Sequence, residues 1–242
     1  MEQKIEKHLS DLDERAYSRG YGVFSEFLKL DEISTLKNMK AKSVYTLYGG
    51  YDGAERCVAG FGCESTEDFP IKCIEISPVN RKFSDNLTHR DVLGAVMNLG
   101  INRNTLGDIK LRDNTAYLFC LESISGYITD SLTQIKHTTV KAQRLESLPE
   151  FINELPDESE LNVSSLRADA VVSAVYKLSR NASSQLFSTG KVFINSRECE
   201  KEASLLNESD VISVRGYGKF IFEGEVRKAK KDRSVISVRI YK

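Results

Sequence analysis

Apolar residues recur at three- and four-residue spacing over 167–178, and this period predicts a helix that buries one face. A second, more polar helix is predicted over 180–189, because Ser179 can act as its N-cap and a glycine follows its last turn. Residues 191–195 and 210–215 alternate between apolar and polar side chains, as half-buried strands do. The last third of the chain is therefore predicted to form a helix pair followed by a small sheet.

The first 70 residues combine helical periodicity with a hairpin pattern. The turn at 49–53 places three glycines between two strand-like runs. A glycine-rich turn can cradle phosphate, but this one lacks the Lys-Ser/Thr ending and the following helix of a P-loop. A hairpin turn is therefore favoured over a nucleotide site. The predicted helices cover 9–17, 25–28 and 31–39, and the predicted strands cover 43–48 and 56–61.

Residues 71–148 follow the order strand, helix, strand, strand, helix, strand, which suggests a ferredoxin-like fold. RNA-recognition domains share this topology and stack bases on aromatic side chains of their central strands. Tyr117 and Phe119 alternate in this way on one predicted strand, but the glycine pattern of those domains is absent. Packing inside the protein is favoured for both rings, with base stacking as the alternative. The predicted elements cover 71–77, 88–99, 106–112, 116–121, 125–134 and 137–145.

Pro149, Pro156 and the acidic run 157–160 separate the middle segment from the C-terminal one and predict a linker. The expected fold class is α+β with three domains. The assignment is an N-terminal helical and hairpin domain at 1–70, a ferredoxin-like, RNA-recognition-like domain at 71–148, a linker at 149–163 and a C-terminal module at 164–242.

Charge divides the chain unevenly. Residues 1–160 hold 19 Lys and Arg against 26 Asp and Glu, a net charge of −7, whereas residues 161–242 hold 15 against 9, a net charge of +6. A basic C-terminal segment on an acidic body indicates nucleic-acid binding by that segment. With 29% charged and 40% hydrophobic residues, the chain otherwise has the composition of a soluble globular protein.

Several functional classes are disfavoured by the sequence. Residues 1–13 are too polar for a signal peptide, and no run approaches the roughly 18 apolar residues of a membrane span. The five cysteines form no C-x-x-C pair and the three histidines are scattered, so we expect neither a metal site nor another cofactor. The expectation is a reduced, cytoplasmic protein without membrane contact.

A set of motifs in the C-terminal module matches a known pattern. The motifs are Arg167-x-Asp169, Ser179-Arg180, Gly190-Lys191-Val192, Asn195 and Asp210-Val-Ile-Ser-Val-Arg215-Gly216. This set resembles the S4 domain, an RNA-binding module. Three positions depart from the family: Ala168 stands for a usual leucine, Ser183 for a usual alanine and Ser196 for a frequent glycine. The first two predict looser packing of the helix pair, and the third affects the turn after Asn195.

Motifs in the other segments extend the resemblance to nearly the full length. They are Gly49-Gly50-Tyr51-x-Gly53-Ala54-Glu55-Arg56, Thr88-His89-Arg90-Asp91-x-Leu93-Gly94-Ala95, Leu99-Gly100-Ile101-x-Arg103 and Gly107-Asp108-Ile109. Together they resemble the YlmH family of cytoplasmic bacterial proteins. The resemblance implies association with the large ribosomal subunit and a role in rescuing stalled subunits that carry peptidyl-tRNA. A link to cell division is attached to the same family.

The hypothesis that follows is RNA binding without chemistry. Basic side chains at element ends would pair with phosphates, and hydroxyl or amide groups would hydrogen-bond sugar, phosphate or an exposed base. The candidate RNA-binding residues are Arg167, Ser179, Arg180, Ser184, Gln185, Lys191, Asn195, Arg215 and Lys219. A further basic run, Lys228, Lys230, Lys231 and Arg233, forms either a second phosphate contact or a solvated turn.

Two other functions remain open. S4 modules are often appended to RNA-modifying enzymes, but residues 1–160 contain neither a Gly-x-Gly-x-x-Gly loop nor a Gly-Arg-Leu-Asp string, which disfavours that class. A protein–protein scaffold would instead rely on the acidic N-terminal domains. We expect a monomer that is not an enzyme and whose partners are ribosomal RNA of the large subunit and tRNA.

Overall fold

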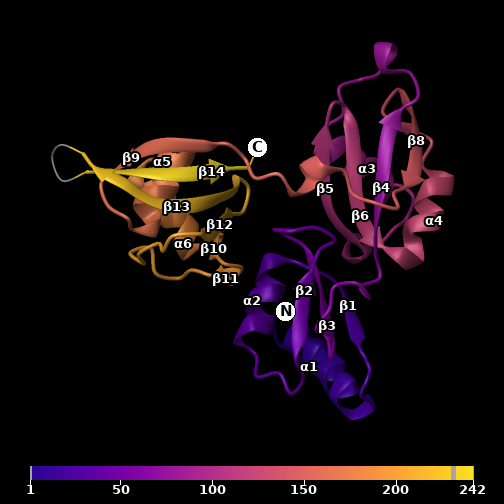
Figure 1. Ribbon diagram of the computed structural model, residues 1–242, viewed down its shortest axis with the longest axis horizontal. Helices are drawn as coiled ribbons and strands as arrows, with labels where there is room; N and C mark the ends of the chain where they lie inside the picture. The colour runs from indigo at the N-terminus through magenta and orange to yellow at the C-terminus, as the bar shows by residue number, and fades with distance from the viewer. Residues whose placement is uncertain (1, 230–232, 242) are drawn as a thin grey trace. The chain divides into compact units, whose positions relative to one another are not determined.

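The computed structural model describes residues 2–229 and 233–241. It is a mixed α/β structure, and its named strand pairs are antiparallel. The chain divides into two compact units (Figure 1). The N-terminal unit runs to Glu32 and continues over Asn38–Asn153, and the C-terminal unit comprises Ile33–Lys37 and Glu154–Lys242.

The elements follow one another in three groups. The first is α1 (Glu2–Arg19), β1 (Val23–Leu28), α2 (Leu30–Asn38), β2 (Tyr45–Tyr48) and β3 (Cys57–Phe61). The second is β4 (Ile71–Pro78), η1 (Arg81–Phe83), α3 (His89–Met97), η2 (Arg103–Thr105), β5 (Leu106–Arg112), β6 (Thr115–Leu121), α4 (Glu122–Ser131), β7 (Gln134–Ile135), β8 (Thr138–Arg144) and η3 (Glu150–Asn153). The third is β9 (Glu158–Val163), α5 (Ala168–Tyr176), α6 (Arg180–Ser188), β10 (Val192–Ile194), β11 (Arg197–Glu198), β12 (Asp210–Val214), β13 (Gly218–Lys228) and β14 (Ser234–Ile240).

A three-stranded sheet of order β1-β3-β2 forms the first part of the N-terminal unit. The hairpin predicted around the glycine turn is confirmed by the pairing of β2 with β3. The helix predicted over 25–28 is wrong, because these residues belong to β1, which pairs along β3 from Val23 opposite Phe61 to Leu28 opposite Cys57. A four-residue window is too short to separate the two periods, and pairing with β3 decides the conformation.

The five-stranded sheet has the order β5-β6-β4-β8-β7, and α3 and α4 contribute to the core on one of its faces. The predicted helix start at Thr88 is confirmed as a capping box, in which the Thr88 hydroxyl accepts from the Asp91 N–H and the Asp91 carboxylate accepts from the Thr88 N–H. The helix predicted over 125–134 begins three residues earlier, because α4 follows β6 directly and Leu121 is its N-cap.

The other face of this sheet packs against aromatic residues of the same unit. Phe119 is 1% exposed, and its ring centroid lies 4.9 Å from that of Tyr51. Tyr117 is 9% exposed, and its ring meets that of Phe151 edge-on at 5.0 Å. The prediction that these two strand residues pack inside the protein is confirmed, and the sheet face that RNA-recognition domains use for stacking is covered here.

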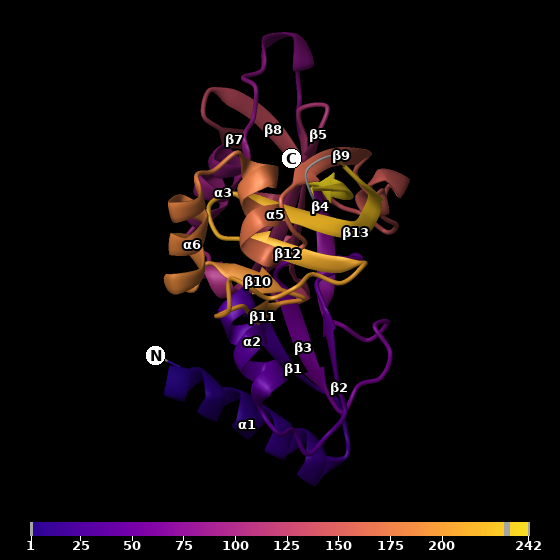
Figure 2. The ribbon, with the colours of Figure 1, turned by 90° about the vertical axis from the view of Figure 1, so that its left-hand side faces the viewer.

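The C-terminal unit contains a six-stranded sheet of order β11-β10-β12-β13-β14-β9. Helices α5 and α6 lie together over one face of this sheet (Figure 2), and one hydrophobic core joins them to it. Ala168, Val171 and Val172 of α5 are fully buried in that core, together with Phe220 of β13. The buried stripe predicted for the first helix is therefore confirmed.

The segment expected to be a linker contains a strand. Residues 158–163 form β9, which pairs with β14 from Val163 opposite Ser234 to Glu158 opposite Arg239. Three acidic residues at 157–160 suggested a solvated tether. Two of them, Glu158 and Glu160, instead lie on an edge strand and accept hydrogen bonds from Arg239 and Arg227, respectively.

The departures from the S4 pattern have structural counterparts. Ser183 is 1% exposed, and its hydroxyl donates to the carbonyl of Asp169 at 2.8 Å, so the extra polar group links α6 to α5. Asn195 and Ser196 form the turn between β10 and β11 with φ of 50° and 62°. A hairpin turn of this kind needs two positive φ values, which explains why glycine is common at the second position.

Candidate nucleic-acid interface

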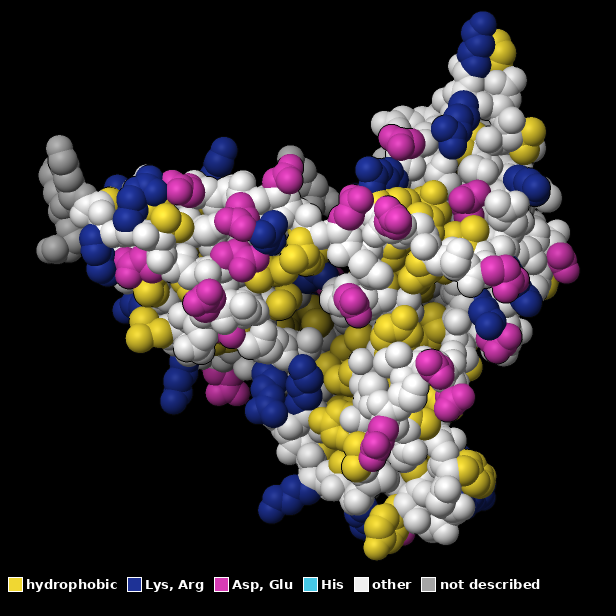
Figure 3. Space-filling model, in the orientation of Figure 1, with side chains coloured by type: hydrophobic (Ala, Val, Ile, Leu, Met, Phe, Trp, Pro, Cys, Tyr) yellow, Lys and Arg dark blue, Asp and Glu magenta, His cyan; other side chains and the backbone are white. Residues whose placement is uncertain are grey.

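The first turns of α5 and α6 and the residues after β9 line a groove of about 810 Å³. Three arginines border the groove, Arg167, Arg180 and Arg233. Two carboxylates, Asp169 and Glu202, border it as well. Basic and acidic side chains are also interspersed over the face of the C-terminal unit drawn in Figure 3. The cationic surface predicted from net charge is therefore discontinuous, and each arginine has to be considered with its neighbours.

Two of the candidate residues in the groove are held by carboxylates. The Arg167 guanidinium donates to Asp169 through Nε at 3.0 Å and through Nη2 at 2.9 Å. The hydrogen bonds and charge of Asp169 raise the pKa of Arg167, and Glu202 adds to this effect. The Ser184 hydroxyl donates to the Glu202 carboxylate. An incoming phosphate would have to compete with both carboxylates.

Arg180 occupies a different electrostatic position at the start of α6. It is exposed, and its guanidinium makes no hydrogen bond or ion pair with another residue of the described chain. The first turn of α6 contains no acidic residue, so nothing in that turn offsets the positive end of the helix. Backbone N–H groups and a guanidinium together form a site that favours an anion. Gln185 lies one and a half turns further along the helix and is also exposed.

Lys191 and Arg215 form a second basic position, beyond the C-terminal end of α6. Both are exposed, and they lie on neighbouring strand ends, because the Arg215 N–H donates to the Lys191 carbonyl at 2.9 Å. The Arg215 guanidinium lies over the ring of Phe193 at 5.0 Å from its centroid. Arg180 and Lys191 thus flank α6, one at each end.

Three other candidates have internal roles. The Ser179 hydroxyl accepts from the Ala182 N–H at 3.2 Å and confirms the predicted N-cap of α6. The Asn195 side chain donates to Asp210 at 2.8 Å and accepts from the Val211 N–H at 2.9 Å, so its amide group supports the hairpin. Lys219 is 8% exposed, and its ammonium lies 4.1 Å from the centroid of the Tyr241 ring. Ser179 and Asn195 are exposed, but their polar side-chain atoms already make internal hydrogen bonds, and Lys219 is buried.

The basic run at 228–233 also contains cations in different environments. Lys228 forms an ion pair with Glu225 at 2.7 Å, whereas Arg233 lines the groove and donates to the Asn162 carbonyl at 3.3 Å. Lys230 and Lys231 lie outside the described residues. The sequence left Arg233 open as either a phosphate contact or part of a solvated turn. Its place in the groove follows from the β13–β14 hairpin and the pairing of β14 with β9, which no local pattern encodes.

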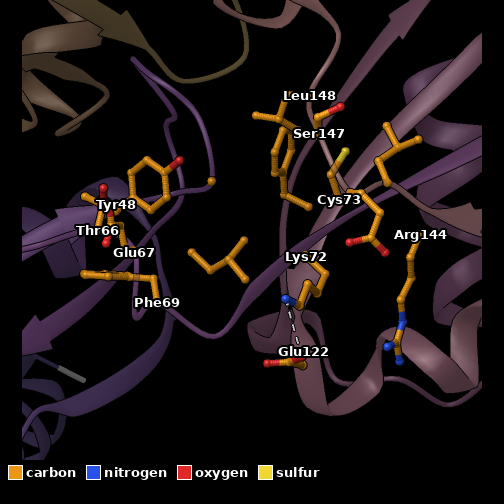
Figure 4. Close-up of a pocket in the computed structure, with 15 residues that line it drawn as sticks. Tyr48, Thr66, Glu67, Phe69, Lys72, Cys73, Glu122, Arg144, Ser147 and Leu148 are labelled. Atoms are coloured by element: carbon orange, nitrogen blue, oxygen red, sulfur yellow. Dashed lines mark ion pairs between the residues drawn. The ribbon is translucent and has the colours of Figure 1, made fainter.

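The N-terminal unit has a separate pocket of about 460 Å³ (Figure 4). Tyr48 and Phe69 contribute aromatic walls, and Lys72 forms an ion pair with Glu122 at 3.5 Å. Burial raises the pKa of the Cys73 thiol to about 12, so at neutral pH this lining residue is protonated and a weak nucleophile. The pocket is equipped for packing or binding rather than for thiol chemistry.

Among the residues that the structure describes, no three or more His, Cys, Asp or Glu side chains are grouped so that they could hold a metal ion. None of the helices in the described part of the chain is both long and apolar enough to cross a membrane.

Comparisons with known proteins give a family and two similar proteins. Residues 64–148 match the family described as "Putative RNA-binding domain in YlmH". The chain is 30% identical over 193 residues to "Ribosome-associated protein quality control protein P2" of Bacillus subtilis (strain 168), covering 76% of this chain and 73% of that protein. A solved structure, "Cell division protein ylmH from Streptococcus pneumoniae", is similar with a TM-score of 0.47 and 19% identity, over 59% of this chain and 90% of that chain.

Proposed function

The chain belongs to the YlmH family, and from this premise we propose that it binds ribosomal RNA of the large subunit and peptidyl-tRNA during the rescue of stalled ribosomes. The similar protein from Bacillus subtilis is named for ribosome-associated quality control, which supports a ribosomal partner. The action proposed here is binding, in which the protein holds RNA and carries out no chemistry on it.

The architecture supports two RNA-binding modules, one in the middle segment and one in the C-terminal unit. Strand order β5-β6-β4-β8 with two helices on one face supports a ferredoxin-like, RNA-recognition-like domain around 71–148. The α5–α6 pair over the sheet supports an S4 domain in the C-terminal unit, and we include β9 in that domain because it pairs with β14.

The observation that carries the proposal is the position of Arg180. An arginine at the first position of α6 lies beside the positive helix end, where its charge is locally unfavourable unless an anion binds. A backbone phosphate of RNA would be attracted by the guanidinium and by the first-turn N–H groups that the Ser179 cap leaves unpaired. Lys191 at the other end of α6 would hold a second phosphate.

Replacing both cations tests the proposal. The variant Arg180→Ala/Lys191→Ala removes two charges from exposed positions, so the fold should persist in circular dichroism. We expect weaker co-sedimentation with purified large subunits and a log–log salt slope that is shallower by about 1.4 to 1.8, because two phosphate contacts are lost. The control is Lys4→Ala/Lys7→Ala on α1, which makes the same charge change at two exposed lysines. Equal binding by wild type and the Arg180/Lys191 variant would refute the site.

A further inference from the structure

The segment between β4 and α3 presents an aromatic side chain to solvent. Phe83 is 78% exposed, the largest fraction among the exposed large hydrophobic residues of the described chain, and Val79 is 67% exposed. Arg81 and Lys82 precede Phe83 and are exposed as well. The segment projects beyond the end of the five-stranded sheet (Figure 1), and its tip carries basic and apolar side chains (Figure 3). We refer to residues 79–83 as the tip.

The base of this segment is fixed by side chains from two neighbouring turns. The Asp85 carboxylate accepts from the His137 N–H at 3.2 Å and from the Thr138 hydroxyl at 3.0 Å. The Asn114 amide, from the turn between β5 and β6, donates to the Ser84 hydroxyl and to the Asp85 carbonyl, both at 2.9 Å. These contacts hold the β5–β6 turn and the β7–β8 turn against Ser84 and Asp85. The tip is therefore attached to the sheet through a hydrogen-bonded base.

The tip itself has a defined local structure. The Asn80 side chain accepts from the Lys82 N–H at 3.1 Å and begins η1, and the Ser84 hydroxyl donates to the Arg81 carbonyl at 3.0 Å. The Lys82 ammonium lies 5.6 Å from the centroid of the Phe83 ring. The Arg81 guanidinium, one residue earlier, donates to the Thr115 hydroxyl at 3.4 Å and remains exposed. A capped turn therefore sets one cation beside the exposed ring and a second at the base of the tip, and little ordering of the backbone is needed before binding.

We propose that the tip is a second RNA contact, in which Phe83 stacks on an unpaired base while Arg81 and Lys82 bind the adjacent phosphates. An aromatic ring next to basic side chains is a combination by which proteins hold single-stranded RNA. The ring can stack on any base, and the cations bind the phosphates that link neighbouring nucleotides. The tip lies within residues 64–148, the stretch that matches an RNA-binding family. This inference rests on the proposed function only in taking RNA as the ligand.

The position also explains how this unit binds RNA when its sheet face is unavailable. Tyr117 and Phe119 are buried against other aromatic residues, so a base has no access to them. The tip offers an exposed ring at the end of the same sheet. A lipid surface is a weaker fit, because only Phe83 and Val79 are apolar and an interfacial anchor needs a broader apolar face.

The sequence provides a direct test, because the chain contains no tryptophan. Phe83→Trp places a single indole at the tip, and Tyr17→Trp places one at a 65% exposed position of α1 as the control. Titration with an oligouridylate of about 12 nucleotides should quench the fluorescence of Trp at 83 and leave that at 17 unchanged. No quenching at 83, or a blue shift with phosphatidylglycerol vesicles and none with RNA, would overturn the proposal.

Affinity measurements on the full chain separate this contact from the groove. Phe83→Ala should weaken oligonucleotide binding about five-fold or more, and Arg81→Ala/Lys82→Ala should lower the salt slope by about 1.4. Lys4→Ala/Lys7→Ala is again the charge-matched control. If only Arg180→Ala/Lys191→Ala weakens binding, the tip proposal fails and the proposed Arg180/Lys191 site stands. If only the tip variants weaken it, the Arg180/Lys191 assignment fails and the tip stands.

Discussion

Arg167 and Asp169 form a two-point ion pair across the start of α5, with N–O distances of 3.0 and 2.9 Å. The pair fixes the direction of the guanidinium and compensates its charge inside the groove. Arg180 borders the same groove and has no such partner among the described residues. Two arginines that are equivalent in the sequence pattern are therefore different in their capacity to attract a phosphate.

This difference predicts unequal effects of single substitutions. Arg180→Ala should weaken binding to large subunits more than Arg167→Ala does, because Asp169 already neutralises the latter arginine. Asp169→Asn should strengthen binding and steepen the salt dependence, since it leaves the Arg167 charge compensated only by the weaker effect of Glu202. Filter binding of ribosomal RNA at several salt concentrations measures all three. A larger loss for Arg167→Ala than for Arg180→Ala would contradict this electrostatic ranking.

Local patterns were sufficient for the helix pair and its ends. The hydroxyl of Ser179, the glycine after α6 and the apolar period of α5 act within one or two turns, and the structure confirms each. The strands β1 and β9 were missed, because they are held by partners distant in sequence, namely β3 and β14. Pairing across such separations overrides composition, and a single sequence does not display it.

The candidate RNA-binding residues show the same limit. Residue type and spacing identified the cations of the C-terminal unit, but the patterns did not indicate that Asp169 pairs with Arg167 or that Tyr241 packs against Lys219. The run Arg81-Lys82-Phe83 of the tip is visible in the sequence, but its pattern alone does not indicate a contact. A basic pair next to an aromatic residue becomes informative only when the ring is known to be exposed.

Ser196 predicts a stabilising substitution. Its φ of 62° places a residue with a Cβ in the left-handed region, at the second position of the turn between β10 and β11. Glycine at this position removes a steric cost of about 1 to 2 kcal/mol from the folded state. It also increases the conformational entropy of the unfolded chain, which lowers stability by about 0.5 to 1 kcal/mol. Ser196→Gly should therefore raise the free energy of unfolding by about 0.5 to 1 kcal/mol in urea denaturation. Ser196→Ala keeps the Cβ and is the control, and a gain of the same size for alanine would exclude backbone strain as the cause.

Asp91 predicts an acid-sensitive contribution from the start of α3. Hydrogen bonds from Lys136 and from Thr88 lower the pKa of this carboxyl from 3.8 to about 2. Because the folded pKa lies below the unfolded one, the stabilisation is present above about pH 4 and is lost as pH falls toward 2. The melting temperatures of wild type and Asp91→Asn should differ by a constant amount above pH 5 and converge as pH falls from 4 to 2. A difference that persists at pH 2 would show that the charge of Asp91 is not responsible.

Gly50 and Phe119 predict a coupled pair in the N-terminal unit. Gly50 has a φ of +98°, and a Cβ built on it would lie 2.4 Å from a ring carbon of Phe119. Gly50→Ala should be strongly destabilising on its own, because the Phe119 ring is 1% exposed and lies 4.9 Å from the Tyr51 ring, so it has little room to move away. Phe119→Ala should cost about 3 to 5 kcal/mol through loss of buried area and the cavity that remains.

The double variant separates the two causes of the Gly50 effect. Removing the ring eliminates the two shortest contacts of the added methyl group and leaves the Ile71 Cγ2 contact at 3.0 Å, so Gly50→Ala should cost less in the Phe119→Ala background than in wild type. The remaining cost should be at least about 1 to 2 kcal/mol, which is the penalty for a Cβ at positive φ before the Ile71 contact is added. Urea denaturation of the four proteins in one cycle measures both terms. Strictly additive losses would mean that the ring does not restrict residue 50, and that the glycine is required there for its backbone conformation alone.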